Sequence, residues 1–280
     1  MLIFYGLYEY WNKTENHWDK NLYDKENLMK YIGDLIDEIV IFNDIPALKK
    51  YLNGYGRTCK NYILPVMTWH ITEILDKKIP SLFVVQSNFI KILDDKAMFF
   101  EYAKASGLEQ YIPLHYDIHS ERNSDTLVLV KPRCGASSAG IYKKKLRDVC
   151  DEDFKDRVVE NYTYGNEEYD AVIVSDKGNI TCSFAYACSF NKKEHIKMQE
   201  GNKIVSYKRV ELDDNVKCVL EQFLKPCQYT GTCCIDFKLC DGKVFIFEIN
   251  PRLNGALASP WNKSDLALVI RHLIYIQDAR

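Results

Sequence analysis

The chain has 280 residues, of which 47% are hydrophobic and 27% are charged, and its formal net charge is -2 at pH 7. Such a chain can bury a sizeable core, and without a basic tract its main partner is not expected to be nucleic acid. No apolar run has the length of a membrane span, and the first six residues lack the features of a secretion signal.

Ten cysteines fall at irregular spacing, and no Cys-x-x-Cys pair occurs. This pattern argues against a structural zinc site. Without a secretion signal, it is typical of reduced thiols in a cytoplasmic chain. The adjacent residues Cys233 and Cys234 are interpreted as strand residues that face opposite ways.

In the N-terminal third, short apolar segments alternate with helix-like stretches. Strands are expected at residues 2–5, 39–42, 62–65 and 82–85. Helices are expected at residues 25–36 and 69–75. Strands that alternate with helices predict a small α/β unit with a parallel sheet.

The middle of the chain predicts a helix and then a strand that leads into a loop. Asp94 or Asp95 is expected to cap a helix that runs to about residue 105 and ends at Gly107. Residues 127–130 predict a strand that delivers Lys131, and a loop of small residues at 135–140 follows. A short helix at 151–157 and a strand at 158–159 come next.

The last part of the chain predicts antiparallel strands and two helices. One hairpin is expected at residues 169–190, with its turn at 176–179, and a second at 233–248, with its turn at Asp241-Gly242. A further strand is expected at 203–210. Helices are expected from Asp213 or Asp214 to residue 224, and from residue 265 to about 276.

Three oxygen-bearing side chains are expected to meet on the second hairpin. Asp236 lies on its first strand, and Glu248 and Asn250 lie at the end of its second. Side chains alternate along a strand, so Glu248 and Asn250 share a face, and the turn brings Asp236 opposite them. Such ligands suit magnesium bound together with substrate phosphates. We favour this over a polar solvent face, because the residues follow the apolar run at 244–247.

Two lysines precede or follow segments that suit phosphate binding. Lys96 stands at a helix start, and Lys131 ends a buried strand before the loop at 135–140. Small residues let backbone N–H groups approach phosphate oxygens closely. Such loops are also common connectors, and neither a P-loop nor a dinucleotide fingerprint is present.

The segment at 158–168 could serve a nucleotide base and its ribose. A strand passing between lobes can present the backbone of Glu160, Asn161 and Tyr162 to an adenine edge, and a carboxylate of Glu167 or Glu168 can accept from ribose hydroxyls. From these residues alone, an exposed acidic loop is an equal alternative.

Taken in order, these segments resemble the ATP-grasp superfamily from about residue 94 to 257. The most specific part is the run Glu-Ile-Asn-Pro-Arg-x-x-Gly that begins at Glu248. The resemblance implies a mixed α/β and α+β chain in three parts. These are a small N-terminal domain at 1–93, a first ATP-grasp lobe at 94–159, and a second lobe with the metal site at 160–280.

The resemblance also implies roles for the residues named above. ATP would lie between the lobes, with Lys96 and Lys131 at its phosphates and the loop around Ser137 and Ser138 closing over them. The adenine would meet Glu160, Asn161 and Tyr162, and the ribose would meet Glu167 or Glu168, a choice that the sequence leaves open. Magnesium, with manganese as an alternative, would be held by Asp236, Glu248 and Asn250. Arg252, together with Lys131, would act on the transferring phosphoryl group.

The implied activity is that of an ADP-forming carboxylate-amine ligase that passes through an acyl phosphate, with amino acids or small peptides as substrates. The alternatives are a bicarbonate-activating enzyme of the carboxylase or carbamoyl-phosphate type, and a catalytically silent ATP-binding regulatory protein. The expected partners are small molecules rather than nucleic acid or membrane, and the sequence does not exclude an oligomer.

Some polar residues are interpreted without a role in this site. His115 and His119 are expected on the surface. The loop at 191–203 could grip an anion, but a solvated surface is favoured for most of its basic residues, which are Lys192, Lys193, His195, Lys197 and Lys203. Cys233 and Cys234 stand where many members of the superfamily carry a basic residue.

Overall fold

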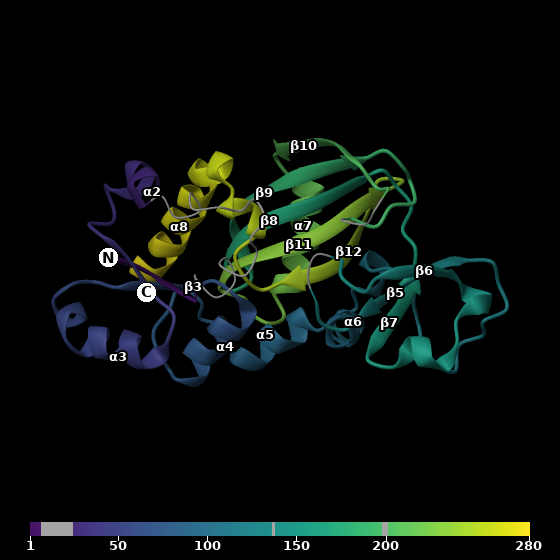
Figure 1. Cartoon of the computed structure of the whole chain (residues 1–280), viewed down its shortest axis with the longest axis horizontal. Helices are drawn as coiled ribbons and strands as arrows, with labels where there is room; N and C mark the ends of the chain where they lie inside the picture. The colour runs from purple at the N-terminus through teal and green to yellow at the C-terminus, as the bar shows by residue number, and fades with distance from the viewer. Residues whose placement is uncertain (7–24, 136–137, 198–200) are drawn as a thin grey trace.

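The computed structural model describes residues 1–6, 25–135, 138–197 and 201–280, and in these ranges the chain forms three sheets. Figure 1 shows an elongated molecule with the three-stranded sheet towards one end, the five-stranded sheet in the middle and the four-stranded sheet at the other end. None of the helices in the described ranges is long and apolar enough to cross a membrane.

The N-terminal sheet is parallel, in the order β2-β1-β3. Its strands are β1 (Leu2–Tyr5), β2 (Ile39–Phe42) and β3 (Tyr62–Pro65), and its helices are α2 (Lys25–Ile32), α3 (Ile45–Asn53) and α4 (Thr68–Asp76). Asp44 caps α3 by accepting a hydrogen bond from the backbone N–H of Ala47. The structure confirms these three predicted strands and the parallel α/β unit.

The fourth predicted strand, at residues 82–85, is wrong. The segment is mostly buried, and it makes single hydrogen bonds to two sheets: Leu82 N–H donates to the Ile63 carbonyl at 2.8 Å, and Val84 N–H to the Thr230 carbonyl at 3.1 Å. It therefore passes between the sheets without joining either. A short apolar run indicates that a segment is buried. It does not show whether the buried segment is a strand or an irregular connection between sheets.

The large sheet is antiparallel throughout, in the order β10-β9-β8-β11-β12. Its strands are β8 (Glu167–Asp176), β9 (Asn179–Phe190), β10 (Ile204–Val210), β11 (Gly231–Cys240) and β12 (Lys243–Asn250). Both predicted hairpins are present. In each turn, two successive residues have positive φ, 51° and 84° at Lys177 and Gly178 and 50° and 77° at Asp241 and Gly242. Two-residue hairpin turns of type I′ require this conformation.

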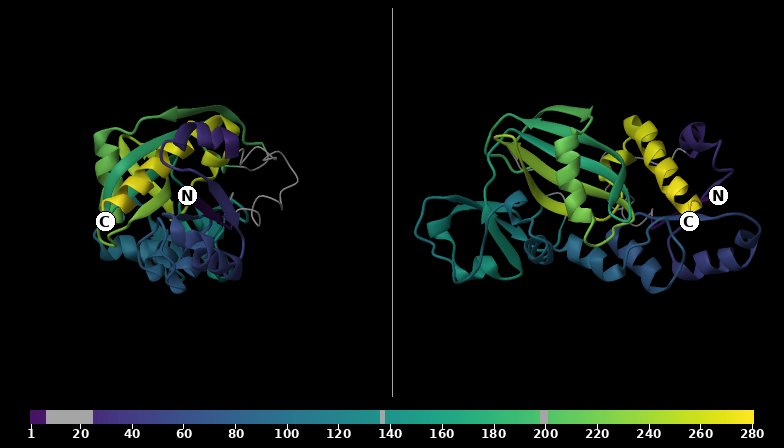
Figure 2. Two further views of the ribbon diagram at one scale, coloured as in Figure 1. Left: turned by 90° about the vertical axis from the view of Figure 1, so that its left-hand side faces the viewer. Right: turned by 180° about the vertical axis from the view of Figure 1, so that it is seen from behind.

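The main core lies between the large sheet, its helices and the N-terminal unit. Helix α7 (Asp214–Leu224) crosses one face of the large sheet, as the rear view in Figure 2 shows. Helix α8 (Lys263–Asp278) runs back to the N-terminal unit, where Arg271 pairs with Asp34 and Asp278 accepts a hydrogen bond from Tyr62. Both ends of the chain consequently lie at the same end of the molecule (Figure 1).

The small sheet has the order β4-β7-β5-β6 and a small core of its own. Its strands are β4 (His115–Tyr116), β5 (Leu127–Pro132), β6 (Tyr142–Lys145) and β7 (Arg157–Asn161). Helices α5 (Ser87–Asp94) and α6 (Lys96–Ala105) connect it to the rest of the chain. The described residues also contain short 3-10 helices at Tyr55–Thr58, Glu109–Tyr111, Leu146–Asp148, Asp151–Phe154, Gly255–Ala258 and Pro260–Asn262.

Candidate active site

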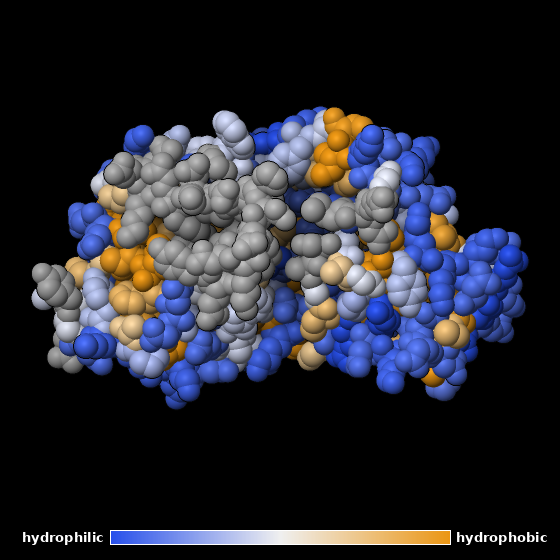
Figure 3. Space-filling model, in the orientation of Figure 1, coloured by the Kyte–Doolittle hydropathy of each residue, from blue (hydrophilic) through white to orange (hydrophobic). Residues whose placement is uncertain are grey.

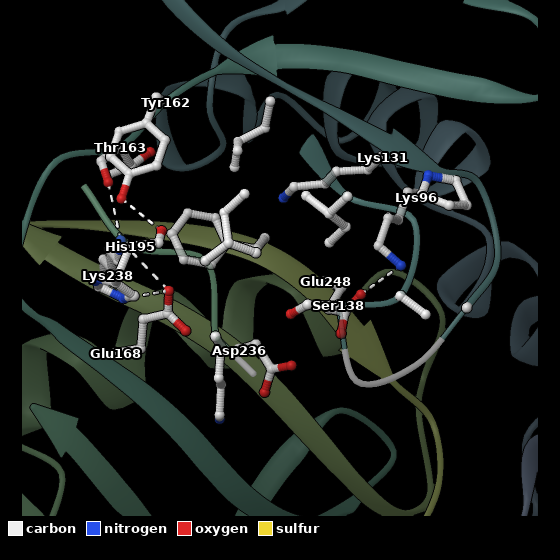
Figure 4. A pocket seen from close by; sticks show the side chains of 18 of the residues that line it. Lys96, Lys131, Ser138, Tyr162, Thr163, Glu168, His195, Asp236, Lys238 and Glu248 are labelled. Carbon is white, nitrogen blue, oxygen red and sulfur yellow. Dashed lines mark hydrogen bonds and ion pairs between the residues drawn. The ribbon is translucent and has the colours of Figure 1, made fainter. Parts of the chain in front are cut away.

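A cleft of about 810 Å³, open solvent at its mouth included, separates the small sheet from the large one. Its walls come from α6, from β5 and the loop after it, from β8, β11 and β12, and from the segment after β9. Figure 4 shows charged side chains from both sheets pointing into this space.

The β11–β12 hairpin places two acidic side chains in the cleft. Asp236 is directly opposite Glu248, and the register shifts immediately after this pair, so that Phe237 pairs with Ile246 and Phe247 is left as a bulge. A bulge redirects side chains locally. Both Phe247 and Glu248 consequently line the cleft, although they are adjacent in a strand.

Three carboxylates stand side by side across three strands. Asp236 on β11 is opposite Asp170 on β8 on one side and Glu248 on β12 on the other. Burial raises the pKa of Asp236 well above its usual range, and the charges of Asp170 and Glu248 raise it further. Crowded acids of this kind are stabilised by a cation, and hard cations prefer such oxygen ligands.

Asn250 completes the predicted metal-ligand set. Its Nδ2 donates to Glu248 Oε1 at 3.0 Å and to Asp236 Oδ2 at 3.4 Å. The three residues therefore lie together, as expected from the sequence. Because a metal ligates the amide oxygen, binding requires the Asn250 amide to turn over. No group of three or more His, Cys, Asp or Glu residues suited to a metal occurs in the described part of the chain, so a cation here would also need oxygens from its substrate.

Lys96 lies against these acids at the first position of α6. Asp95 caps this helix by accepting from the backbone N–H of Ala97, which fixes the start of α6 at the cleft. Lys96 Nζ is 2.6 Å from Glu248 Oε2. Burial favours the protonated form of Glu248, but Lys96 outweighs it and holds the pKa of Glu248 at about 2.

Lys131 enters the cleft from the end of β5 and pairs with Glu160 on the neighbouring strand β7. Glu160 lies beneath Lys131, and its side chain is only 2% exposed. Neither Glu160 nor Asn161 is among the residues that line the cleft, and Asn161 instead accepts from the Tyr116 hydroxyl at 2.7 Å. Of the three residues expected at the adenine, only Tyr162 lines the cleft, next to Thr163.

Strand alternation places Glu168 and Glu167 on opposite sides of β8. Glu168 faces the cleft, where it is 2.9 Å from His195 Nε2 and 3.4 Å from Lys238 Nζ. Glu167 faces the other side of β8 and accepts from Ser189 and Tyr169. Burial favours the neutral form of Glu168, but the His195 hydrogen bond and Lys238 lower its pKa.

The loop after β9 contributes two residues to the cleft, His195 and Lys197. His195 is 2% exposed, and its ring stacks on Phe190 with centroids 3.7 Å apart. Lys197 Nζ is 2.6 Å from Asp170 and lines the cleft. Lys192, Lys193 and Lys203 are exposed, as favoured for most of this loop, whereas His195 and Lys197 are the exceptions. The only feature of the sequence that could have indicated their position is the apolar residue Ile196 between them.

Of Arg252 and the small-residue loop, only part of the loop lines the cleft. Arg252 does not line the cleft; its Nη2 donates to Asn250 Oδ1 at 3.3 Å and its Nη1 to the Leu253 carbonyl at 2.9 Å. Ser138 lines the cleft and has a φ of 55°. Ser137 lies outside the described residues. Cys234 stands where many members of the superfamily carry a basic residue. Its Sγ is 3.2 Å from Asp236 Oδ1.

Comparison with known proteins matches the chain to one family. A family model described as an ATP-grasp domain matches residues 94–256, which is more than half of the chain. No curated protein matches. Among solved structures, D-alanine–D-alanine ligase from Bacillus anthracis has a TM-score of 0.60 at 16% identity, with 98% of this chain and 95% of that chain covered.

Two further structures show the same fold. L-amino acid ligase from Bacillus licheniformis has a TM-score of 0.63 at 14% identity, with 97% of this chain and 73% of that chain covered. The biotin carboxylase domain of 2-oxoglutarate carboxylase from Hydrogenobacter thermophilus, in complex with MgADP and bicarbonate, has a TM-score of 0.60 at 12% identity, with 100% and 70% covered. At these identities, the similarity establishes the fold.

Proposed function

The chain belongs to the ATP-grasp family, and we propose that it is an ADP-forming ligase that activates a carboxylate as an acyl phosphate for attack by an amine. The observation that carries this proposal is the convergence of opposite charges in one cleft. Asp236 and Glu248 come from the large sheet, and Lys96 and Lys131 come from α6 and the small sheet. Phosphoryl transfer requires such neutralisation and positioning more than a protein nucleophile.

Each residue has a defined part in this proposal. Lys96 and Lys131 neutralise the ATP phosphates, Glu168 accepts from the ribose, and Tyr162 and Thr163 flank the base. Asp236, Glu248 and Asn250 would hold magnesium, which would offset the charge of the phosphates when bound. The crowding of Asp170, Asp236 and Glu248 fits a divalent cation.

Arg252 and the walls of the cleft protect and orient the reacting group. Arg252 lies next to Asn250 and also donates to the Leu253 carbonyl, which keeps its guanidinium beside the metal-ligand set when the Asn250 amide turns over. There it can stabilise the phosphoryl group in transfer. An acyl phosphate hydrolyses readily, and Phe247 and Ile141 supply apolar walls that exclude water. In the remaining step, an amine attacks the acyl carbon and displaces phosphate.

We propose amino acids or small peptides as the substrates. The fold is shared with a D-alanine–D-alanine ligase and an L-amino acid ligase, which motivates this choice as an analogy. The experiment is to supply MgATP with pairs of amino acids, to measure ADP release and to identify products by mass. Ligated product with equimolar ADP supports the proposal. ADP release that depends on bicarbonate overturns the substrate class, and binding of MgATP without any turnover overturns the catalytic function.

A further inference from the structure

Lys131 continues behind the cleft wall into a buried chain of three ionisable side chains, two of which the proposed function does not use. Lys131 on β5 pairs with Glu160 Oε1 on β7, and Glu160 Oε2 is 3.4 Å from Nε2 of His115 on β4. The side chains of His115, Glu160 and Lys131 are 11%, 2% and 6% exposed, respectively. The expectation that His115 lies on the surface is therefore wrong.

The tautomer of His115 follows from its other contact. Nδ1 is 2.8 Å from the carbonyl oxygen of Pro113, and because a carbonyl can only accept, Nδ1 must carry a proton and donate it. In a neutral imidazole, Nε2 then presents its lone pair to the carboxylate of Glu160. This contact becomes attractive only when Nε2 is also protonated.

The surroundings hold His115 in place and set its charge. Its ring stacks on Phe100 of α6, with centroids 4.1 Å apart. Burial lowers the pKa of His115 and outweighs the opposing effects of Glu160 and, more weakly, Glu101. The positive charge of Lys131 also lowers the pKa of His115. The charged groups around this histidine are therefore Glu101, Glu160 and Lys131.

Glu160 depends on Lys131 because it has few alternatives. Apart from Lys131, no described residue donates a hydrogen bond to Glu160 Oε1. A buried carboxylate that loses its cation incurs a large desolvation penalty, and a second cation nearby relieves it. The only other ionisable group in contact with this carboxylate in the described residues is His115.

We propose that nucleotide binding draws Lys131 from Glu160 towards the phosphates, and that His115 takes up a proton in response. The proton comes from solvent and binds to the Nε2 lone pair, so Glu160 exchanges one cationic partner for another. His115 is thus a positioning residue that acts through Glu160 on Lys131. This inference rests on the proposed use of ATP and adds a proton linkage to it.

Linkage fixes the sign of the effect. If ATP binding favours protonated His115, then protonated His115 favours ATP binding by the same factor. ATP affinity should therefore rise as pH falls through the pKa of His115, by up to about tenfold per pH unit. Protonation of His115 leaves Lys131 less neutralised by Glu160, which is the physical cause.

The first test is calorimetric titration of the full chain with MgATP in buffers of different ionisation enthalpy. The wild type should take up as much as about one proton per nucleotide more than His115→Gln at pH values between the pKa of His115 in the free protein and its higher pKa in the complex. His119→Gln, which removes an exposed histidine of the same segment, should match the wild type. Equal proton uptake by the wild type and His115→Gln at every pH would overturn the proposal.

The second test needs no nucleotide, and so separates this inference from the proposed function. The ring signals of the six histidines are followed by NMR against pH, with His115 assigned from its absence in His115→Gln. Lys131→Met should raise the pKa of His115, because Glu160 loses its other cation, and adding Glu160→Gln should reverse that rise. An unchanged pKa in Lys131→Met would sink the inference, whereas a failure of the wild type to bind MgATP would sink the proposed function.

Discussion

On the large sheet, three carboxylates stand in register across β8, β11 and β12 and face the cleft. On the opposite side, α6 and the small sheet supply Lys96 and Lys131. The large-sheet side thus brings the ligands for a cation, together with Lys197 and Lys238, and the other side brings cations for an anion. A magnesium–triphosphate complex contains both charges, so the difference between the two walls is the physical basis of the proposed function.

The two walls are also held together differently. The large sheet packs into the main core with α7, α8 and the N-terminal unit, whereas the small sheet rests on a core of five buried apolar residues: Val128, Val130, Leu146, Val149 and Val159. The end of the molecule that carries the small sheet shows a mainly hydrophilic surface in Figure 3. We therefore expect polar contacts to matter more for stability in the small sheet than in the large one.

The largest expected effect comes from neutralising the acidic wall. Glu248→Gln should fold normally and lose turnover by about 10²- to 10³-fold or more, because the cation site loses a charge and Lys96 loses its partner. Circular dichroism checks the fold and an ADP assay measures turnover. Glu167→Gln, on the outer side of β8, is the control and should retain activity. Normal turnover in Glu248→Gln would reject the metal assignment.

Neutralising the basic wall should weaken nucleotide binding. Lys96→Met and Lys131→Met each remove a charge-assisted contact, and each should raise the dissociation constant for MgATP by about 10- to 100-fold. Calorimetric titration measures the constant. Lys145→Met, at an exposed position on β6, serves as the matched control. If Lys96→Met and Lys131→Met bind MgATP as tightly as the control Lys145→Met, the basic wall does not contact the phosphates.

A smaller effect is expected where the large sheet meets the base and ribose. Glu168→Gln should weaken MgATP binding by about tenfold, since one charged acceptor is lost while the side-chain volume is kept. Glu167→Gln should bind like the wild type, because Glu167 faces away from the cleft. Equal losses in the two variants, measured by calorimetry, would contradict the assignment of faces along β8.

The smallest effect concerns the stability of the small sheet. Burial raises the pKa of Asp153, but Lys144 and Tyr142 outweigh it and hold the pKa well below its usual range. This stabilisation is present above the unfolded pKa of about 3.9 and is lost as pH falls through the lower native pKa.

Asp153→Asn should therefore destabilise the small sheet by about 1–3 kcal/mol at neutral pH, with a smaller difference in strong acid. Hydrogen exchange of the β6 amides measures this locally. Glu152→Gln, at an exposed neighbouring position, is the control and should leave exchange unchanged. Unchanged exchange in Asp153→Asn would show that the polar contacts do not hold this sheet.

Much of the fold could be predicted because its signals are local. The apolar runs at β1, β2 and β3 and the turns at Lys177-Gly178 and Asp241-Gly242 depend on neighbouring residues only. Strand β6 could not be predicted from its Tyr-Lys-Lys-Lys sequence. Its half-buried Tyr142 and Lys144 are held by Asp153, a contact that hydrophobic periodicity does not reveal.

The candidate site divides in the same way. Asp236, Glu248 and Asn250 were predictable because strand alternation and one hairpin turn bring them together. His115 and His195 were not, because their burial depends on Phe100, Glu160 and Glu168, which lie on other elements. Environment set by distant parts of the chain is what single-sequence patterns leave out.

The most direct test of the account is whether metal and nucleotide bind together at the acidic wall. Electron paramagnetic resonance of Mn²⁺, added to the protein with and without ATP, measures this. We predict tight Mn²⁺ binding only when ATP is present, and its loss in Glu248→Gln but not in Glu167→Gln. Mn²⁺–ATP binding that is equally tight in the wild type and Glu248→Gln would contradict the central claim.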